Sequence, residues 1–288
     1  MDYLIVIPGL LMSLVLIFLF VIHLSFRPKK ITENKSPLDF GIKYQEQYIP
    51  GLSNKKLFSW LLINEKNIGT IIMIHGWGGN SEFMLPLAQP FYHAGFNILL
   101  IDARGHGNSD SYMFSSLPRF AEDIESAKSW LQSKYPSLSN KLCLIGHSVG
   151  ASAVLLAASR QTDLNAVISI APFAHPELLM QRYLQEKHLP NAVIQLILKY
   201  IEKLIGTSFD SIAPINTVCN VSAPVLIVHG KEDSTVPISD AYLIIENCEQ
   251  REIYFLELDD TKHDSVEKIK EHFPQIIIFL KQCGYSIS

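Results

Sequence analysis

The stretch Lys141 to Ser159 reads KLCLIGHSVGASAVLLAAS and decides the fold, because it predicts a strand, a sharp turn and a helix in immediate succession. KLCLI is an apolar run of strand length, and ASAVLLAAS is an apolar, alanine-rich segment typical of a buried helix. In the turn GHSVG, Gly146 and Gly150 flank Ser148 at the two positions where close backbone approach excludes larger side chains. The pattern predicts a nucleophilic serine on a strained strand-to-helix elbow.

The regions on both sides of this stretch alternate between apolar runs of strand length and helical patterns. Such alternation predicts an α/β fold with a mostly parallel sheet and helices on both faces, because a helix usually connects consecutive parallel strands. Predicted helices include Phe120 to Leu131 and Val266 to Leu280, where apolar residues recur every three or four positions. The predicted strands are a hairpin of Gln45 to Ile49 and Lys56 to Ile63, then Thr70 to Ile74, Phe96 to Ile101, Leu142 to Ile145, Ala166 to Ala171, Val225 to Val228 and Glu252 to Leu256.

The interval from Ala171 to Val225 is too long for one crossover, and it contains apolar helical segments. We therefore expect a small helical cap insertion, about residues 172–214, over the carboxyl edge of the sheet, where open α/β sheets bind ligands. Within NAVIQLILKYIEKLIG, apolar residues recur at helical spacing. Either they only pack the cap onto the core, or some of them also line an apolar acyl pocket. These residues are Val193, Leu196, Ile197, Tyr200, Ile201, Leu204 and Ile205.

A nucleophilic serine needs a general base, and the base needs an acid that orients it. The segments HGKEDSTVP, which contains Asp233, and LDDTKHDS, which contains His263, each follow a predicted strand. In α/β folds that carry a serine on such an elbow, the three residues occur along the chain in the order serine, acid, histidine. We expect Ser148 as nucleophile, His263 as base and Asp233 as acid. Glu232 is the alternative acid, and an ordinary solvated loop histidine is the competing interpretation of His263.

The reaction also requires two backbone N–H groups that stabilise the oxyanion. Val149, the residue after the nucleophile, supplies one. The second is expected from Trp77 in the loop HGWGGN, whose glycines let the backbone approach the site. We interpret His75 in that loop, and Arg104 and His106 in the loop DARGHGNSD, as structural residues rather than as a second base.

Composition narrows the possible partners and cofactors. The 288 residues carry 24 Lys and Arg against 28 Asp and Glu, a net charge of −4, so no basic field favours nucleic acid. The four cysteines are scattered without metal-ligand spacing, which predicts reduced thiols and neither a zinc site nor a disulfide framework. We expect no metal and no cofactor.

The N-terminus differs from the rest of the chain. Residues Tyr3 to Phe26 carry no charge and are numerous enough to cross a bilayer as a helix, which predicts a retained transmembrane anchor at residues 3–26. A cleaved signal peptide and a buried core helix are the alternatives. The cations that follow predict a single-pass membrane protein with its catalytic domain on the cytoplasmic side. They are Arg27, Lys29, Lys30 and Lys35. Residues 27–40 are predicted to be a polar linker, and residues 41–288 the catalytic domain.

Together the five motifs HGWGG, DARGHGNSD, GHSVG, HGKEDSTVP and the His263 loop resemble the α/β-hydrolase superfamily, in its serine-aminopeptidase-like and monoacylglycerol-lipase-like branch. The resemblance extends from about Thr70 to the C-terminus. It implies a Ser148, Asp233 and His263 triad with Trp77 and Val149 as oxyanion donors. One departure is Lys262, which stands where many relatives have glycine before the histidine.

The resemblance implies a serine hydrolase that cleaves a carboxylic ester or thioester of an apolar, lipid-like acyl substrate through an acyl-enzyme. The alternatives are an aminopeptidase-type amide hydrolase and a catalytically silent, membrane-tethered binding protein, since fold alone does not fix function. The sequence does not predict the oligomeric state.

Overall fold

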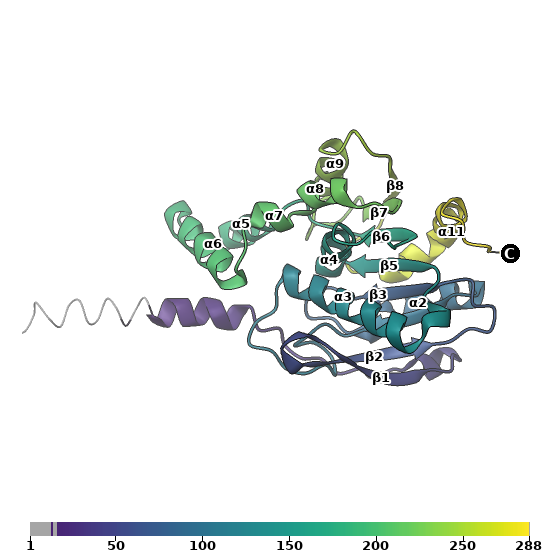
Figure 1. Cartoon of the computed structure of the whole chain (residues 1–288). Helices are drawn as coiled ribbons and strands as arrows, with labels where there is room; N and C mark the ends of the chain where they lie inside the picture. The colour runs from purple at the N-terminus through teal and green to yellow at the C-terminus, as the bar shows by residue number, and fades with distance from the viewer. Residues whose placement is uncertain (1–12, 14–15, 288) are drawn as a thin grey trace, which may run out of the picture.

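A computed structural model describes residue 13 and residues 16–287, and these fold around one eight-stranded sheet (Figure 1). The strand order is β1-β2-β4-β3-β5-β6-β7-β8, in which β3 to β8 run parallel and β2 runs antiparallel to both of its neighbours. The strands are β1 (Gln45–Pro50), β2 (Lys56–Leu62), β3 (Thr70–Ile74), β4 (Asn97–Ile101), β5 (Leu142–His147), β6 (Ala166–Ile170), β7 (Val225–Gly230) and β8 (Ile253–Leu258). The predicted mostly parallel sheet is confirmed, with strand ends that differ by at most two residues.

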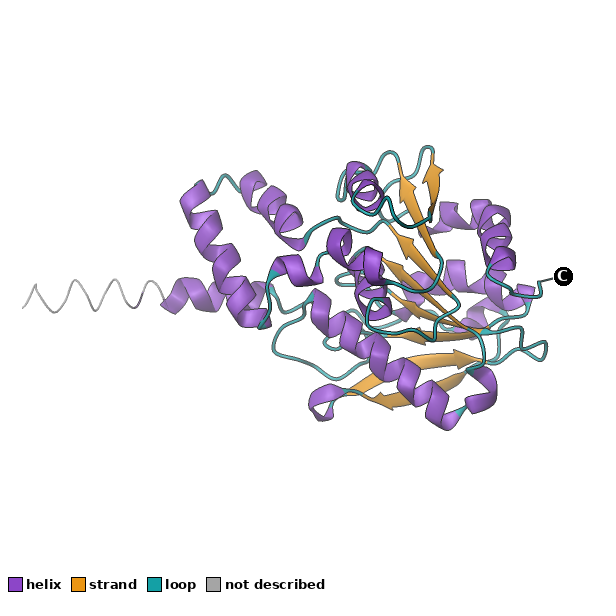
Figure 2. Cartoon of the chain, turned by 45° about the horizontal axis from the view of Figure 1, so that its top comes forward, coloured by secondary structure: helices purple, strands orange, loops and turns teal. Residues whose placement is uncertain are grey.

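Helices cover both faces of the sheet, as Figure 2 shows. They are α2 (Ser81–Ala94), α3 (Leu117–Lys134), α4 (Val149–Ala158), α9 (Ser239–Glu246), α10 (Val266–Ile269) and α11 (Phe273–Gln282). Alternate strand residues point to opposite faces. Ile72 and Leu144 therefore join the apolar cluster of α3 and α4, whereas Ile71 and Ile145 join that of α2 and α11.

The C-terminal helical pattern is interrupted where one helix was predicted. The 3-10 turn η5 (Lys270–His272) separates α10 from α11, and Pro274 lies in the first turn of α11. Proline lacks the backbone N–H that a helix interior requires, so the first turn of a helix accommodates it best. The apolar periodicity survives the interruption, because Val266, Ile269 and Ile276 are all buried.

The long excursion between β6 and β7 is helical, and it begins where β6 ends. It consists of α5 (Pro176–Glu186), α6 (Asn191–Ile205), α7 (Phe209–Ile212), α8 (Pro214–Thr217) and the 3-10 turn η4 (Val218–Asn220). The buried face of α6 is formed by Ile194, Ile197, Leu198 and Ile201. Leu196, predicted to belong to this face, is 65% exposed. The predicted apolar face of α6 was therefore partly wrong, because the helix is rotated about its axis and buries Ile194 and Leu198 in place of Leu196.

One ion pair fixes the first helix of this excursion to α9. Arg182 of α5 donates from its two terminal nitrogens to the two carboxylate oxygens of Asp240, each over 2.7 Å. The Asp240 side chain is almost fully buried and also accepts from the Ala174 amide over 2.9 Å. A planar guanidinium matches a carboxylate in this two-point geometry, so the pair fixes the direction of α5 as well as its distance from α9.

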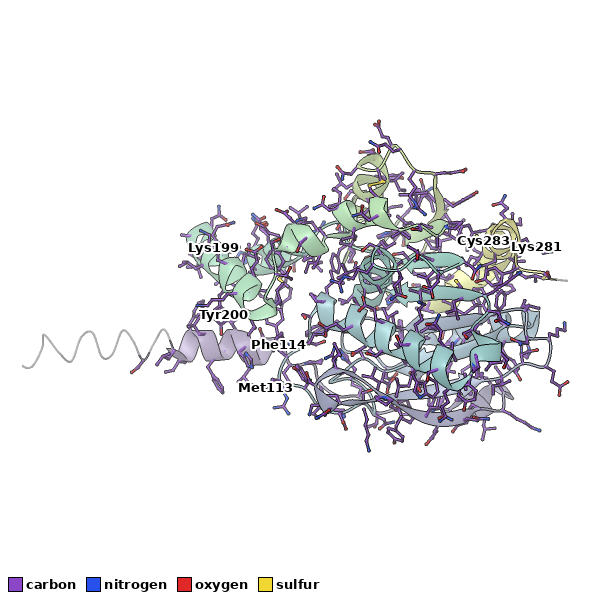
Figure 3. All side chains as sticks on the ribbon, in the orientation of Figure 1. Met113, Phe114, Lys199, Tyr200, Lys281 and Cys283 are labelled. Carbon is purple, nitrogen blue, oxygen red and sulfur yellow. A yellow bond between two sulfur atoms is a disulfide. The ribbon has the colours of Figure 1, made fainter. Side chains whose placement is uncertain are left out.

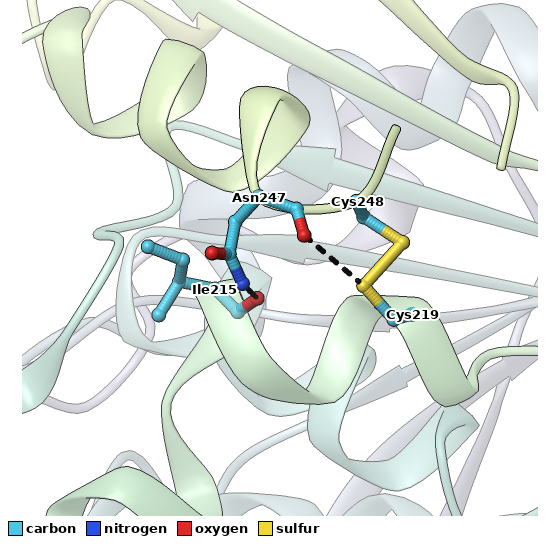
Figure 4. Close-up of a disulfide and its surroundings, with 4 residues drawn as sticks. All are labelled: Ile215, Cys219, Asn247 and Cys248. Carbon is cyan, nitrogen blue, oxygen red and sulfur yellow. Dashed lines mark hydrogen bonds between the residues drawn. A yellow bond between two sulfur atoms is a disulfide. The ribbon is translucent and has the colours of Figure 1, made fainter. Parts of the chain in front are cut away.

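Cys219 and Cys248 form a disulfide that joins η4 to the end of α9 (Figure 4). Their Cα atoms are 5.6 Å apart, and the nearby Asn247 side-chain amide donates to the Ile215 carbonyl over 2.9 Å. The prediction of four reduced thiols was therefore wrong. The two residues are 29 positions apart in sequence, and only the packing of α8, η4 and α9 brings them together. Cys143 and Cys283 are free.

The N-terminal prediction lies largely outside the described residues, which omit residues 1–12, 14 and 15. Residues 16–25 are helical, and in the described chain no helix has both the length and the hydrophobicity needed for a bilayer crossing. Ile22 is buried in the same apolar cluster as α6, and both Figure 1 and Figure 2 place the two helices side by side.

The short helical turns that remain are η1 (Pro37–Phe40), η2 (Leu52–Asn54) and η3 (Pro136–Leu138).

Candidate functional site

Ser148 lies on the sharp turn between β5 and α4. Its backbone has φ 55° and ψ −117°, a conformation that non-glycine residues rarely adopt. A Cβ atom on Gly146 would collide with the backbone of Gly150, and one on Gly150 would collide with the carbonyl of His75. The two glycines of the motif are therefore required by close backbone contacts on both sides of the turn.

The three side chains predicted to act together are in hydrogen-bond contact. Ser148 Oγ lies 2.9 Å from His263 Nε2, and His263 Nδ1 lies 2.6 Å from Asp233 Oδ2. Asp233 follows β7 and His263 follows β8, so the carboxyl ends of three parallel strands supply the three groups. This arrangement can move a proton from the serine hydroxyl to the imidazole while the carboxylate fixes the ring.

The environment of Asp233 favours its ionised form. The side chain is nearly buried, and its Oδ1 accepts from the Thr235 and Val236 amides over 2.9 and 2.8 Å. Burial tends to raise the pKa of Asp233, but hydrogen bonds from His229, His263 and the Val236 amide outweigh it and hold that pKa well below its ordinary value. The neighbouring Glu232 is exposed to solvent. Asp233, and not the alternative Glu232, therefore contacts the histidine.

His147 supports the histidine loop, a role the sequence analysis did not identify. The Nε2 atom of His147 lies 2.8 Å from the carbonyl oxygen of His263. The rings of Phe83 and His147 pack with their centroids 5.2 Å apart. Burial, together with the nearby His263, lowers the pKa of His147 to about 4, so at neutral pH the ring is uncharged. The neutral ring donates its Nε2–H to the carbonyl. No pattern in the sequence pointed to this contact between residues 116 positions apart.

His147, His263 and Asp264 could also be considered as metal ligands, because their ligand atoms lie within 4.8 Å of one another. However, both ring nitrogens of His263 already contact Ser148 and Asp233, and Nε2 of His147 contacts a carbonyl.

The loop after β3 also approaches Ser148. A Cβ atom on Gly76 would lie 3.0 Å from Ser148 Cβ, a tight contact that would require the serine to shift slightly. Trp77 follows directly, and its side chain is 42% exposed. Val149 is the first residue of α4, where helix amides have no partner within their own helix. The two predicted oxyanion donors thus belong to two backbone segments that adjoin the serine.

His75 and Arg104 hold the surrounding loops in place. His75 accepts from the Ala103 amide through Nε2 over 3.1 Å and donates from Nδ1 to the Gly76 carbonyl over 2.6 Å. Complete burial lowers the pKa of His75 and keeps the ring neutral. Arg104 is buried and forms ion pairs with Glu122 and Asp123, each over 2.6 Å. Neither residue is among the contacts of Ser148 and His263, in agreement with the structural roles expected for both.

A cavity of about 780 Å³ lies beside this site, between α2 and the loop that carries His263. Its lining includes Phe83, which packs on His147, and Asp264, the residue after the candidate base. Ile31 and Lys35, from the segment predicted to be a linker, form another wall. The N-terminal segment therefore contributes directly to the surroundings of the site.

Comparison with known proteins places this arrangement in context. The family described as Serine aminopeptidase, S33, matches residues 65–211. The uncharacterized protein YqkD of Bacillus subtilis is 31% identical over 184 residues, which are 62% of this chain and 59% of YqkD. The uncharacterized membrane protein YNL320W of Saccharomyces cerevisiae is 25% identical over 225 residues, 74% of this chain and 71% of that protein. This chain thus matches less than two thirds of the length of YqkD.

Solved structures agree with the fold. The esterase Pf2001 of Pyrococcus furiosus superposes with a TM-score of 0.74 at 21% identity, covering 89% of this chain and 97% of the esterase. Est1E of Butyrivibrio proteoclasticus, solved with ferulic acid bound, gives a TM-score of 0.62 at 19% identity and covers 81% of this chain and 98% of Est1E. At these identities the likeness establishes the α/β-hydrolase fold.

Proposed function

We propose that this chain, which belongs to the serine aminopeptidase S33 family, is a serine hydrolase that cleaves a carboxylic ester or thioester. The observation that carries the proposal is the continuous hydrogen-bonded series from Ser148 through His263 to Asp233, with the serine held on a strained turn. A binding protein has no use for a strained serine next to a histidine, so the geometry favours catalysis over a silent scaffold.

The proposed reaction begins when His263 Nε2 accepts the proton of Ser148 Oγ as this oxygen attacks the carbonyl carbon of the ester. The N–H groups of Trp77 and Val149 stabilise the resulting oxyanion. The imidazolium then donates its proton to the leaving alcohol or thiol as the bond to it breaks, which leaves an acyl group on Ser148. Water then attacks the carbonyl carbon of this acyl-enzyme and gives a proton to the same imidazole. The imidazolium returns this proton to Ser148 Oγ as the bond between Oγ and the acyl group breaks, which releases the acid. Asp233 stabilises the imidazolium throughout.

The proposed substrate carries an apolar acyl chain. Support comes from the cap, where α5 and α6 present partly buried apolar side chains that pack against the apolar core cluster to which the buried residues of α6 belong. They include Leu179, Met180, Leu184, Val193 and Tyr200. Each methylene that such a surface removes from water contributes up to about 0.8 kcal/mol.

We also propose that residues 3–26 anchor the protein in a membrane as a single pass, which would bring the site close to lipid substrates. The cations after this run favour a cytoplasmic catalytic domain. The Cys219–Cys248 disulfide favours the opposite side, because disulfides persist in oxidising compartments. Labelling intact cells with a membrane-impermeant lysine reagent decides between the two: modification of the domain without lysis would contradict the cytoplasmic placement.

The ester proposal is tested by kcat/KM for p-nitrophenyl esters of increasing acyl length. Specificity is expected to rise with chain length until the pocket is full. A flat profile, or a preference for acetate, would contradict the apolar substrate but not hydrolysis itself.

The family description supports amide hydrolysis as a second candidate. Aminoacyl p-nitroanilides tested in parallel distinguish it, because an aminopeptidase would cleave these anilides in preference to long-chain esters.

A further inference from the structure

Residues 26–36, here called the strap, connect the N-terminal helix to the catalytic domain and lie along the loop Gly76 to Asn80. The Phe26 ring packs edge-on against the Trp77 ring at 6.4 Å. At the other end of the loop, the Asn80 side-chain amide donates to the Ile31 carbonyl over 2.9 Å. The proposed oxyanion loop therefore contacts Phe26 at one end and, at the other, the segment that the sequence analysis predicted to be a polar linker.

The orientation of Asn80 shows that its contact with the strap takes the place of an ordinary helix cap. Asn80 is the N-cap residue of α2, a position where asparagine usually accepts a hydrogen bond from its own helix. Its side chain makes no such bond and is nearly buried. Its amide instead donates to the strap, while the first amide of α2, that of Ser81, donates to the Asp102 carboxylate over 2.7 Å.

The strap is also fixed to the neighbouring loop, which contains Asn108 and Ser109. Lys30 Nζ donates to the Ser109 carbonyl over 2.5 Å, and the Asn108 side-chain amide donates to the Glu33 carboxylate. The Ser115 amide donates to the Phe26 carbonyl over 2.8 Å, which fixes the backbone at the start of the strap. The strap is thus held by side chains and by backbone along most of its length.

Trp77 contacts both the strap and the domain. Its ring packs edge-on against Phe26 and against His106, the latter at 5.8 Å, and the residue is 42% exposed. His106 is buried and in turn packs on Phe120 of α3 at 5.1 Å. Removing the Phe26 ring would remove the aromatic contact between the strap and the Trp77 ring, and the Trp77 backbone follows directly after Gly76, which lies close to Ser148.

We propose that the strap positions the oxyanion loop, with Phe26 and Asn80 as positioning residues that act through the Trp77 backbone. The inference rests on the proposed hydrolase function and adds a role for the N-terminal segment within it. The N-terminal helix ends immediately before Phe26 and lies near the domain surface, where His23 packs on Phe114 at 5.8 Å. In Figure 3 this helix lies beside Phe114 and near Tyr200 of α6. Attachment of the N-terminus and alignment of the catalytic loop are thus served by one continuous segment.

The experiment compares Phe26→Ala with Phe20→Ala in the full-length protein. Phe20 is a matched control, because it lies in the same N-terminal segment and is 61% exposed. Asn80→Asp, which keeps the shape but removes the donor to Ile31, is compared with Asn140→Asp at an exposed asparagine before β5. The readouts are kcat and KM on p-nitrophenyl acetate and amide hydrogen exchange of residues 76–80.

We expect kcat to fall at least about 10-fold in Phe26→Ala and Asn80→Asp, with KM within about twofold of the wild type, because loss of an oxyanion donor acts mainly on the transition state. Exchange at residues 76–80 should rise in both variants and in neither control. Phe26→Tyr, which restores an aromatic edge, should recover most of kcat.

Wild-type exchange at residues 76–80 in both variants would overturn the inference, as would faster exchange with kcat unchanged. Absence of turnover by the wild-type protein would instead refute the proposed function. The exchange measurement would then still decide whether the strap holds the loop.

Discussion

The elbow at the end of β5 and the N-terminal strap both contact the same loop, but they are specified in different ways. Ser148, Gly146 and Gly150 lie within five consecutive residues, and their backbone contacts dictate which residue types fit. The strap instead reaches the loop through pairs such as Phe26 with Trp77 and Ile31 with Asn80, about 50 residues apart in sequence. A strained local turn can be recognised from the residue types at fixed positions of a short motif. Contacts between distant segments depend instead on the tertiary structure.

The first prediction concerns the elbow, where the largest effect is expected. Ser148→Ala and His263→Ala should each lower kcat by about 10⁶-fold, as in enzymes whose serine and histidine act as one unit. Thermal unfolding and hydrolysis of a short ester measure fold and activity separately. Retention of more than a few per cent of wild-type turnover by either folded variant would remove that residue from the mechanism.

The acid on the β7 loop is expected to give the next largest effect. Asp233→Asn should lower kcat on the order of 10⁴-fold, because the acid fixes the tautomer of His263. Glu232→Gln, one residue earlier and exposed, is the matched control and should remain close to the wild type. A severe loss in the control together with a mild loss in Asp233→Asn would assign the acid role to Glu232.

The attachment of the cap gives a smaller effect, on stability. Arg182→Ala leaves the buried carboxylate of Asp240 without its ion-pair partner. Breaking a fully buried pair costs about 3–5 kcal/mol, and the partial exposure of Arg182 reduces this to about 1–3 kcal/mol. Urea denaturation measures the change, with Gln185→Ala on the exposed end of α5 as the control. Equal stability of the two variants would mean that the ion pair does not hold the cap.

The smallest effect is expected from the pH dependence of the strap. Burial, followed by the carboxylates of Asp102 and Glu82, raises the pKa of Glu33 to about 8 from an ordinary value of 4.5. The folded protein therefore binds this proton more tightly than the unfolded chain does, so the contribution of Glu33 is full below pH 4.5 and is lost as pH rises through 8. The urea midpoint should fall more between pH 6 and pH 9 in the wild type than in Glu33→Gln. Parallel pH profiles for the two proteins would contradict this assignment.

Much of the fold was accessible from sequence because its signals are local. The apolar run Thr70 to Ile74 forms β3 with the same bounds, and the segments that follow β7 and β8 place Asp233 and His263 at one edge of the sheet. Parallel strands that end at a common edge bring such residues together without any further information. The catalytic roles of these residues remain predictions, although their contacts are present.

The features that could not be predicted from the sequence depend on contacts between segments that are distant along the chain. The Cys219–Cys248 disulfide and the Arg182–Asp240 pair both form on α9 or at its end, against segments that are distant in sequence. The α6 face was misassigned at Leu196, because helical spacing fixes which residues share a face but not how the helix is rotated against its neighbours. The polar composition of the strap concealed its docking, because most of its contacts are hydrogen bonds and not apolar burial.

The most direct test of the central claim is labelling of the full-length protein with a fluorophosphonate, followed by mass mapping of the modified peptide. An activated serine should react once, on Ser148, and the adduct should be absent in Ser148→Ala and form far more slowly in His263→Ala. Absence of an adduct on Ser148 in the folded wild-type protein would contradict the account.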